Sequence, residues 1–210
     1  SSSDPSKASV PASVTIPAGQ SSVTFQVTGV DLTGGAAVTI DATAAGYTAP
    51  ATKVQVQVAE PVLSLASVNT DRSVGQARNG IYVRVRGPAA SPYAANQTMA
   101  TSTPVSVAVV DANPAGLVDG IYSASTGGTA ITQVVVAAGS NDSNYGYVGT
   151  PTMPGSYRVS ASATGMATVT SSVVTVSAPE LTFSRATEVV GKGMRTYGSS
   201  LSVQRTVNGS

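Results

Sequence analysis

The 210-residue chain has no cysteine, no histidine and no tryptophan. The lack of cysteine excludes disulfides and thiolate metal sites. The lack of histidine removes the commonest general base, the Ser-His-Asp and Cys-His triads and the usual zinc ligand. Serine and threonine are abundant, but no lysine is suitably placed to activate them; the only three are Lys7, Lys53 and Lys192. The sequence therefore predicts a protein that is not an enzyme and has no cofactor.

Charge is scarce as well, because charged residues make up 10% of the chain and the net charge is +1. A nucleic-acid-binding surface usually combines a basic stripe with aromatic platforms, and aromatic residues are only 5% of this sequence. No apolar run approaches the roughly 18 residues that a membrane-spanning helix needs. We therefore expect neither a nucleic-acid partner nor a membrane span.

What the chain does contain is 41% hydrophobic residues arranged in alternating runs, the pattern of half-buried β-strands. The stretches 34–61 and 154–179 resemble each other, and each holds an alternating strand, a Gly-containing turn and a second alternating strand. The segments before them also match, since 134–149 lies 120 positions after 14–29. The number of residues between matching positions falls to 118 at the end of the second strand of each stretch, where Val58 matches Val176. These matches predict an internally repeated β protein.

The segment before the first of these hairpins is also predicted to form strands. Val14 and Ile16 alternate with polar residues, a turn follows, and Val23, Phe25 and Val27 alternate again. With the hairpin that comes next, the pattern predicts about four strands, which is roughly half of a β-sandwich.

The chain after residue 179 repeats the pattern that begins at residue 62. The predicted matches are Leu181 with Leu63, Phe183 with Leu65, Leu201 with Val83, and Val203 with Val85. A unit of roughly 119 residues with seven or eight short strands fits an immunoglobulin-like sandwich. We predict an all-β fold of tandem immunoglobulin-like β-sandwiches, one complete unit flanked by two partial units. The predicted boundaries are 1–60 for the C-terminal part of one unit, 61–179 for the complete unit, and 180–210 for the N-terminal part of another.

The motif SVTIPAGQSSVTFQVTG (13–29), followed by a Gly-rich loop and VTIDATAAGY (38–47), resembles the tandem bacterial immunoglobulin-like domains of large surface proteins and adhesins. The resemblance implies an extracellular or cell-surface location and a structural role as a stalk, sheath or filament component. Such modules are usually spacers, sometimes stiffened by calcium, that carry a separate adhesive or enzymatic domain. The alternative is an adhesin or a carbohydrate-binding accessory module of a secreted protein.

Carboxylates are the candidates for a calcium site, because hard oxygen ligands at module junctions stiffen tandem arrays. Glu60 and Glu180 lie at the predicted junctions, and Asp111 and Asp119 flank an Asn-Pro-Gly loop. These carboxylates are scattered singly, and Asp beside Asn, Pro and Gly is the ordinary composition of a turn. We expect no metal site and keep calcium as the alternative.

Two arginines and two tyrosines are the candidates for binding a surface glycan or a protein ligand. Arg84 and Arg86 share the polar face of a predicted strand, where arginine also protects sheets against edge pairing. Tyr145 and Tyr147 follow a polar stretch and would suit a sugar-binding patch.

The matching positions in the other copy of the repeat, however, are Phe25 and Val27. Apolar residues there favour a core or sheet-face role for the two tyrosines. Tyr93 and Tyr122 are the other aromatic residues of the complete unit that would join a binding surface.

Short junctions connect the predicted units, and each contains a proline (59–61 and 178–180). Proline restricts its own φ and its neighbour's conformation, so the junctions predict an extended, semi-rigid rod. Half a sandwich exposes an apolar face and unpaired edges. Either the partial units belong to a longer array, or the C-terminal part of one chain completes the N-terminal part of the next, head to tail. The longer array is favoured, because the trailing part has too few strands.

Overall fold

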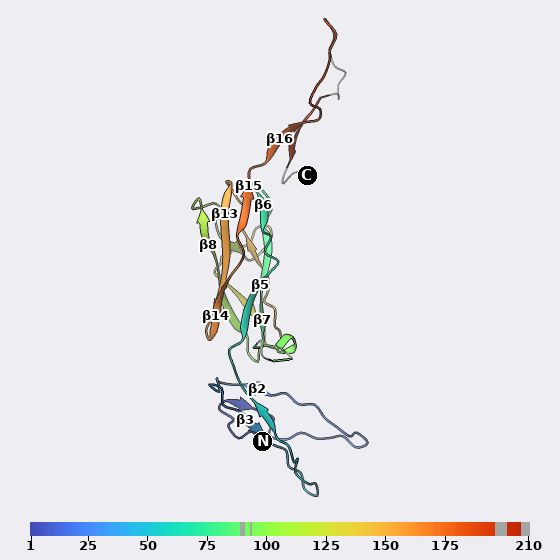
Figure 1. The fold of residues 1–210 in the computed structure, drawn as a ribbon, viewed down its shortest axis with the longest axis vertical. Helices are drawn as coiled ribbons and strands as arrows, with labels where there is room; N and C mark the ends of the chain where they lie inside the picture. Colours follow the sequence, from blue (N-terminus) through green and yellow to red (C-terminus); the bar gives the residue numbers. More distant parts are fainter. Residues whose placement is uncertain (89–90, 93, 196–200, 207–210) are drawn as a thin grey trace.

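The computed structural model describes residues 1–88, 91–92, 94–195 and 201–206. Its regular structure is almost entirely β-strand, and the one helical element of those residues is a single 3-10 turn, η1 (Ala94–Asn96). The predicted all-β fold class is confirmed. The chain forms a central sandwich of two sheets, with a smaller segment at each end (Figure 1).

The first sheet of the sandwich has five strands in the order β10-β9-β12-β7-β5, all paired antiparallel. Its strands are β5 (Val62–Ala66), β7 (Asn79–Arg86), β9 (Ile121–Tyr122), β10 (Ala130–Ile131) and β12 (Gly146–Val148). Successive side chains of a strand point to opposite faces. Ile81, Val83 and Val85 of β7 are therefore buried in the core, while the residues between them face outward.

The second sheet has the order β11-β8-β13-β15-β6, with β14 paired to the far end of β13. Its strands are β6 (Asp71–Ser73), β8 (Thr103–Asn113), β11 (Gln133–Val136), β13 (Gly155–Ala163), β14 (Met166–Thr170) and β15 (Val174–Ser177). The pairings are antiparallel except for that of β6 with β15, which is parallel. The central strand β13 contributes Tyr157, Val159 and Ala161 to the core.

The strand order is that of an immunoglobulin constant-type sandwich. With β5, β7, β8, β9, β12, β13 and β15 counted as the seven strands, the first, second, fourth and fifth form one sheet. The third, sixth and seventh form the other, as in that fold. After β5 the chain changes sheets, so that β6 lies beside the last strand.

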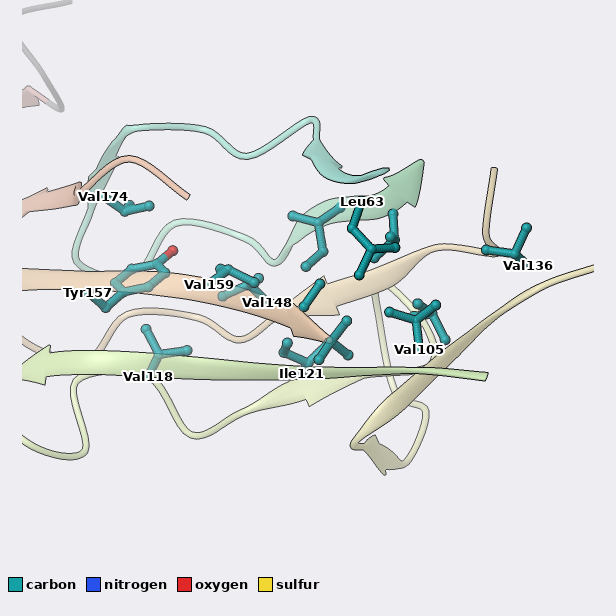
Figure 2. Close-up of a cluster of buried hydrophobic side chains, with 14 of the residues drawn as sticks. Leu63, Val105, Val118, Ile121, Val136, Val148, Tyr157, Val159 and Val174 are labelled. Carbon is teal, nitrogen blue, oxygen red and sulfur yellow. The ribbon is translucent and has the colours of Figure 1, made fainter. Parts of the chain in front are cut away.

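The core between the two sheets is mainly aliphatic. Figure 2 shows side chains from both sheets pointing into one layer, among them Leu63, Val105, Val118, Ile121, Val136, Val148, Val159 and Val174. Full burial of each Val or Leu side chain stabilises a fold by roughly 1.5–3 kcal/mol. Valine and leucine thus supply the burial that tryptophan and disulfides supply in antibody domains.

Arg72 of β6 is buried among these apolar groups, with 1% of its surface exposed. Its Nη1 donates to the carbonyl oxygen of Gly149 (2.9 Å) and to the hydroxyl of Tyr157 (3.0 Å). Its Nη2 donates to the carbonyl oxygen of Ala77 (2.7 Å). The guanidinium thus joins three separate parts of the sandwich.

The amino-terminal segment contains two small antiparallel pairs. They are β1 (Ala8–Ser9) with β2 (Thr28–Gly29), and β3 (Val38–Ile40) with β4 (Val54–Val56). Ala8, Val38 and Ile40 form a buried cluster of their own. This cluster is much smaller than that of the sandwich.

The strands predicted between β1 and β2 are wrong. Val14, Ile16 and Phe25 lie in irregular chain and are 48%, 53% and 46% exposed. Val134 and Val136, the sequence matches of Val14 and Ile16, are strand residues with at most 1% exposure. An alternating segment becomes a stable strand when a second layer covers its apolar face. Within the described chain, no such layer covers residues 14–27.

The carboxyl-terminal segment contains one hairpin, β16 (Glu180–Phe183) with β17 (Val203–Thr206). Its register pairs Phe183 with Val203, as the register of β5 and β7 pairs Leu65 with Val83. By register, Val203 therefore corresponds to Val83, two residues away from the predicted match with Val85. Leu181 and Phe183 are 75% and 66% exposed.

Candidate functional site

The outward face of the five-stranded sheet gathers four tyrosines. Tyr82 belongs to β7, Tyr122 to β9 and Tyr147 to β12, and Tyr145 directly precedes β12. The register of β12 sets Tyr147 between Tyr122 on one side and Gly80 on the other. Since the residues next to them in sequence point into the core, strand alternation brings these rings to the same outer surface. We call this surface, formed by Tyr82, Tyr122, Tyr145 and Tyr147, the tyrosine face.

The ring of Tyr145 contacts two of the other three rings. Tyr82 and Tyr145 meet edge to face with centroids 5.4 Å apart, and the rings of Tyr145 and Tyr147 are 6.1 Å apart with planes 29° from parallel. A Cβ atom on Gly80 would lie 3.2 Å from Tyr147 and 3.3 Å from Tyr145. The two rings therefore cover the glycine backbone, while Tyr145 keeps half of its surface exposed.

A salt bridge closes one end of the tyrosine face. Arg84 Nε donates to Asp142 Oδ1 (2.6 Å) and Arg84 Nη2 donates to Oδ2 (2.7 Å), the two-point geometry of a strong arginine-carboxylate pair. Arg84 also donates to the Tyr82 hydroxyl at 3.3 Å. The hydrogen bonds from Arg84 hold the pKa of Asp142 below its ordinary value and raise the pKa of the guanidinium.

A second charged group closes the other end. The guanidinium carbon of Arg78 lies 3.5 Å from the ring centroid of Tyr122, a cation-π contact. Arg78 also donates to the carbonyl oxygens of Ala124 and Gly127. The Tyr122 hydroxyl donates to Asp119 Oδ2 at 2.5 Å, and this hydrogen bond raises the pKa of Tyr122.

The structure brings together three of the four predicted ligand-binding residues, namely Arg84, Tyr145 and Tyr147. The fourth, Arg86, lies two residues further along the outward side of β7. It is exposed and makes no ion pair with any described residue. Tyr93 lies outside the described residues.

Tyr82, Arg78 and Gly80 were not predicted as members of a binding surface. Strand alternation placed Arg84 and Arg86 on the outward face of β7, and the same alternation extends to Tyr82. The register between β7, β9 and β12 was not readable, because loops of unequal length join these strands. That register is what sets Gly80 beside Tyr147.

The four calcium candidates do not converge. Glu60 precedes β5 at one end of the sandwich, whereas Glu180 begins β16 at the other end (Figure 1). Asp111 has a φ of 53° and faces Arg158 at 3.9 Å, and Asp119 is bonded to Tyr122. In the described ranges, no group of three or more acidic residues could hold a metal ion.

Two open depressions lie elsewhere on the surface of the described residues. One lies between β8 and the loop that leads to β9, and another lies between the end of β5 and the segment after β14. None of the helical structure in the described part of the chain is long and apolar enough to cross a membrane.

The sequence matches no protein-family model and no curated protein. Among solved structures, a glycosyl hydrolase family 2 member from Bacteroides cellulosilyticus is similar with a TM-score of 0.37 and 9% identity. That match covers 73% of this chain and 18% of the hydrolase chain. A likeness at this level is too distant to transfer a function.

Proposed function

We propose that the chain is a non-catalytic structural component of a bacterial extracellular surface, a stalk, sheath or filament part built from tandem immunoglobulin-like modules. The observation that carries the proposal is that the hairpin on the amino-terminal side of the sandwich repeats a register found inside it. The resemblance of the repeat to bacterial surface proteins supports the proposed extracellular location.

The amino-terminal hairpin supports this proposal through its register. Between β3 and β4, Val38 pairs with Val56. Within the sandwich, Tyr157 of β13 pairs with Val174 of β15. The sequence repeat matches Val38 with Tyr157 and Val56 with Val174, so the pairing is the same in both places. The carboxyl-terminal hairpin is antiparallel like the pair of β5 with β7, but its register differs by two residues from the one that the sequence match predicts.

The exposed apolar residues of the end segments also support a modular array. Leu181 is 75% exposed, whereas its counterpart Leu63 is 5% exposed between the sheets. Ile16 and its counterpart Val136 differ in the same way. Apolar surface of this kind favours contact with a complementary layer. We propose that the layer is another module of the same type.

The strand arrangement suits a component under tension. The chain reaches β5 and β6 from one pole of the sandwich and leaves β15 at the opposite pole (Figure 1). Because β6 and β15 are parallel, pulling on the two ends shears one strand along the other. The bonds from Thr175 N to Thr70 O (2.7 Å) and from Val74 N to Ser177 O (3.1 Å) then stretch together.

Single-molecule force spectroscopy on the full chain tests this proposal. We expect one dominant unfolding event that lengthens the chain by about 40 nm, for about 115 residues extended at about 3.5 Å each. Val74→Pro removes one donor from the β6–β15 pair and should lower the unfolding force, since proline has no N–H.

Val190→Pro is the matched control, because Val190 lies in irregular chain. It should leave the unfolding force unchanged. If the sandwich of the unmodified chain extends without a force peak, the proposed tension-bearing role is wrong.

A further inference from the structure

We propose that the tyrosine face binds an acidic oligosaccharide, a short chain of pyranose rings that carries carboxylate groups. This site is distinct from the structural role proposed above, because it uses only the outward side of one sheet. Strand pairing and the junctions with the end segments do not involve these side chains.

The first argument is the orientation of the rings. Tyr145 and Tyr147 both lie beside the Gly80 backbone, and Tyr145 keeps half of its surface exposed. The rings are nearly parallel, and their 6.1 Å centroid separation exceeds the roughly 3.5–4 Å contact distance of stacked carbons. The two rings are therefore not in full face-to-face contact, and together they form one aromatic patch. The negative faces of such rings attract the slightly positive C–H groups of a sugar ring.

The second argument is the length of the surface. Tyr122 is the cross-strand neighbour of Tyr147, and Tyr82 contacts Tyr145. The four rings thus run across three strands, which are spaced about 4.8 Å apart. Arg78 lies over the Tyr122 ring and Arg84 over the Tyr82 ring, so Tyr145 and Tyr147 form the stacking surface and the two arginines border it. A row of this length fits several linked sugar rings better than a single one.

The third argument is the polar border. The phenol groups of Tyr145 and Tyr147, and the carboxylates of Asp142 and Asp119, surround the rings with hydrogen-bonding groups suited to sugar hydroxyls. Arg84 donates two hydrogen bonds to Asp142, and this pair fixes the position of the Asp142 carboxylate beside the rings.

Charge favours an acidic sugar over a neutral one. The face and its border contain three arginines and two aspartates, namely Arg78, Arg84, Arg86, Asp119 and Asp142. Arg78 and Arg84 are held by carbonyl groups and by Asp142. Arg86 is exposed and has no ion pair among the described residues, so it remains available to a ligand carboxylate.

Isothermal titration calorimetry of the full chain with tetragalacturonate tests the proposal, with mannotetraose as the neutral probe. We expect saturable binding of tetragalacturonate that weakens with added salt, and much weaker binding of mannotetraose. Tyr145→Ala should lower the affinity about tenfold, the equivalent of one lost stacking contact. Arg86→Gln should lower the affinity and reduce its salt dependence.

Tyr47→Ala is the matched control, because Tyr47 is 82% exposed and lies in the amino-terminal segment. It should bind as the unmodified chain does. Tyr145→Phe keeps the ring and should retain most of the affinity, which separates lost stacking from damage to the fold.

Three results would overturn the proposal. The first is no binding of tetragalacturonate by the unmodified chain. The second is equal binding of both tetrasaccharides without an effect of Arg86→Gln. The third is binding that Tyr145→Ala leaves unchanged, since the sugar would then lie elsewhere. None of these results bears on the unfolding force, so the structural role is tested separately.

Discussion

Among single residues, Arg72 is the one whose removal should cost the sandwich most. Its guanidinium donates to the carbonyl oxygen of Gly149 and to the Tyr157 hydroxyl in the interior, and to the carbonyl oxygen of Ala77 nearer the surface. Arg72→Met removes these bonds and leaves the buried Gly149 carbonyl and Tyr157 hydroxyl without this donor. We expect the free energy of unfolding in urea to fall by about 3 kcal/mol.

The control for this variant is Arg86→Met, which removes an exposed arginine from the neighbouring sheet. It should change the unfolding free energy by no more than about 0.5 kcal/mol. Equal effects of the two variants would mean that the bonds of Arg72 contribute nothing beyond those of a surface side chain.

Asp142 gives a second residue-scale prediction, in its response to acid. The hydrogen bonds from Arg84 lower its pKa in the folded chain, below the value of about 3.9 for an unfolded aspartate. The pair therefore contributes stability above about pH 4, and the contribution is lost as the pH falls through the folded pKa.

Carbon-detected NMR titration of the carboxyl groups measures this directly. The midpoint of Asp142 should lie below the ordinary aspartate value, and Arg84→Gln should move it upward. A midpoint that Arg84→Gln does not move would show that the ion pair does not form in solution.

At the residue scale, the sequence predicted which face some side chains occupy, but it did not predict which residues pair across strands. Alternation placed Arg84 on an outward face, and the polar context singled out Tyr145 and Tyr147. The partner of Arg84 is Asp142, 58 residues away. That separation is bridged only by strand register, which a single sequence does not encode locally.

At the scale of elements, the central strand β13 shows how alternation separates core from surface. Val159 of β13 is fully buried, whereas Val135 of β11, in the same sheet, is 45% exposed. Val159→Ala leaves a cavity and should lower the free energy of unfolding by about 2–3 kcal/mol.

Val135→Ala is the matched substitution on the outer side of the same sheet. We expect it to change the unfolding free energy by less than about 0.5 kcal/mol. Urea unfolding of both variants measures the difference, and similar losses would contradict the assigned faces of the sheet.

The strands predicted from Val14 to Val27 show where the same reasoning fails. Period-2 alternation is as clear there as in β11, yet only Thr28 and Gly29 at its end join a strand. A pattern specifies which face a strand would bury, but burial requires a second layer. The alternating pattern can be recognised in the sequence, whereas the presence of a covering layer cannot.

At the scale of the whole molecule, the exposed apolar residues of the end segments predict self-association. Leu181 and Phe183 lie on the outside of the β16–β17 hairpin, mostly open to water. If they contact another module head to tail, sedimentation velocity of the full chain should show association that increases with concentration.

The double variant Leu181→Ser and Phe183→Ser should weaken this association, because it removes apolar contact area. Val62→Ser is the control, since Val62 is also exposed but belongs to the sandwich. A full chain that stays monomeric at every concentration would exclude contact between separate chains and leave only contact within a longer chain.

The chain enters the sandwich at one end, through β5, and leaves it at the opposite end, after β15 (Figure 1). Its nine-residue central strand β13 alone spans about 30 Å at about 3.3 Å per residue. Two fluorescent dyes attached beside residues 61 and 179 would therefore keep a fixed energy-transfer efficiency while the sandwich is folded. Unfolding would separate the dyes severalfold in one step. The energy-transfer efficiency between the two dyes would thus report directly whether the sandwich is folded.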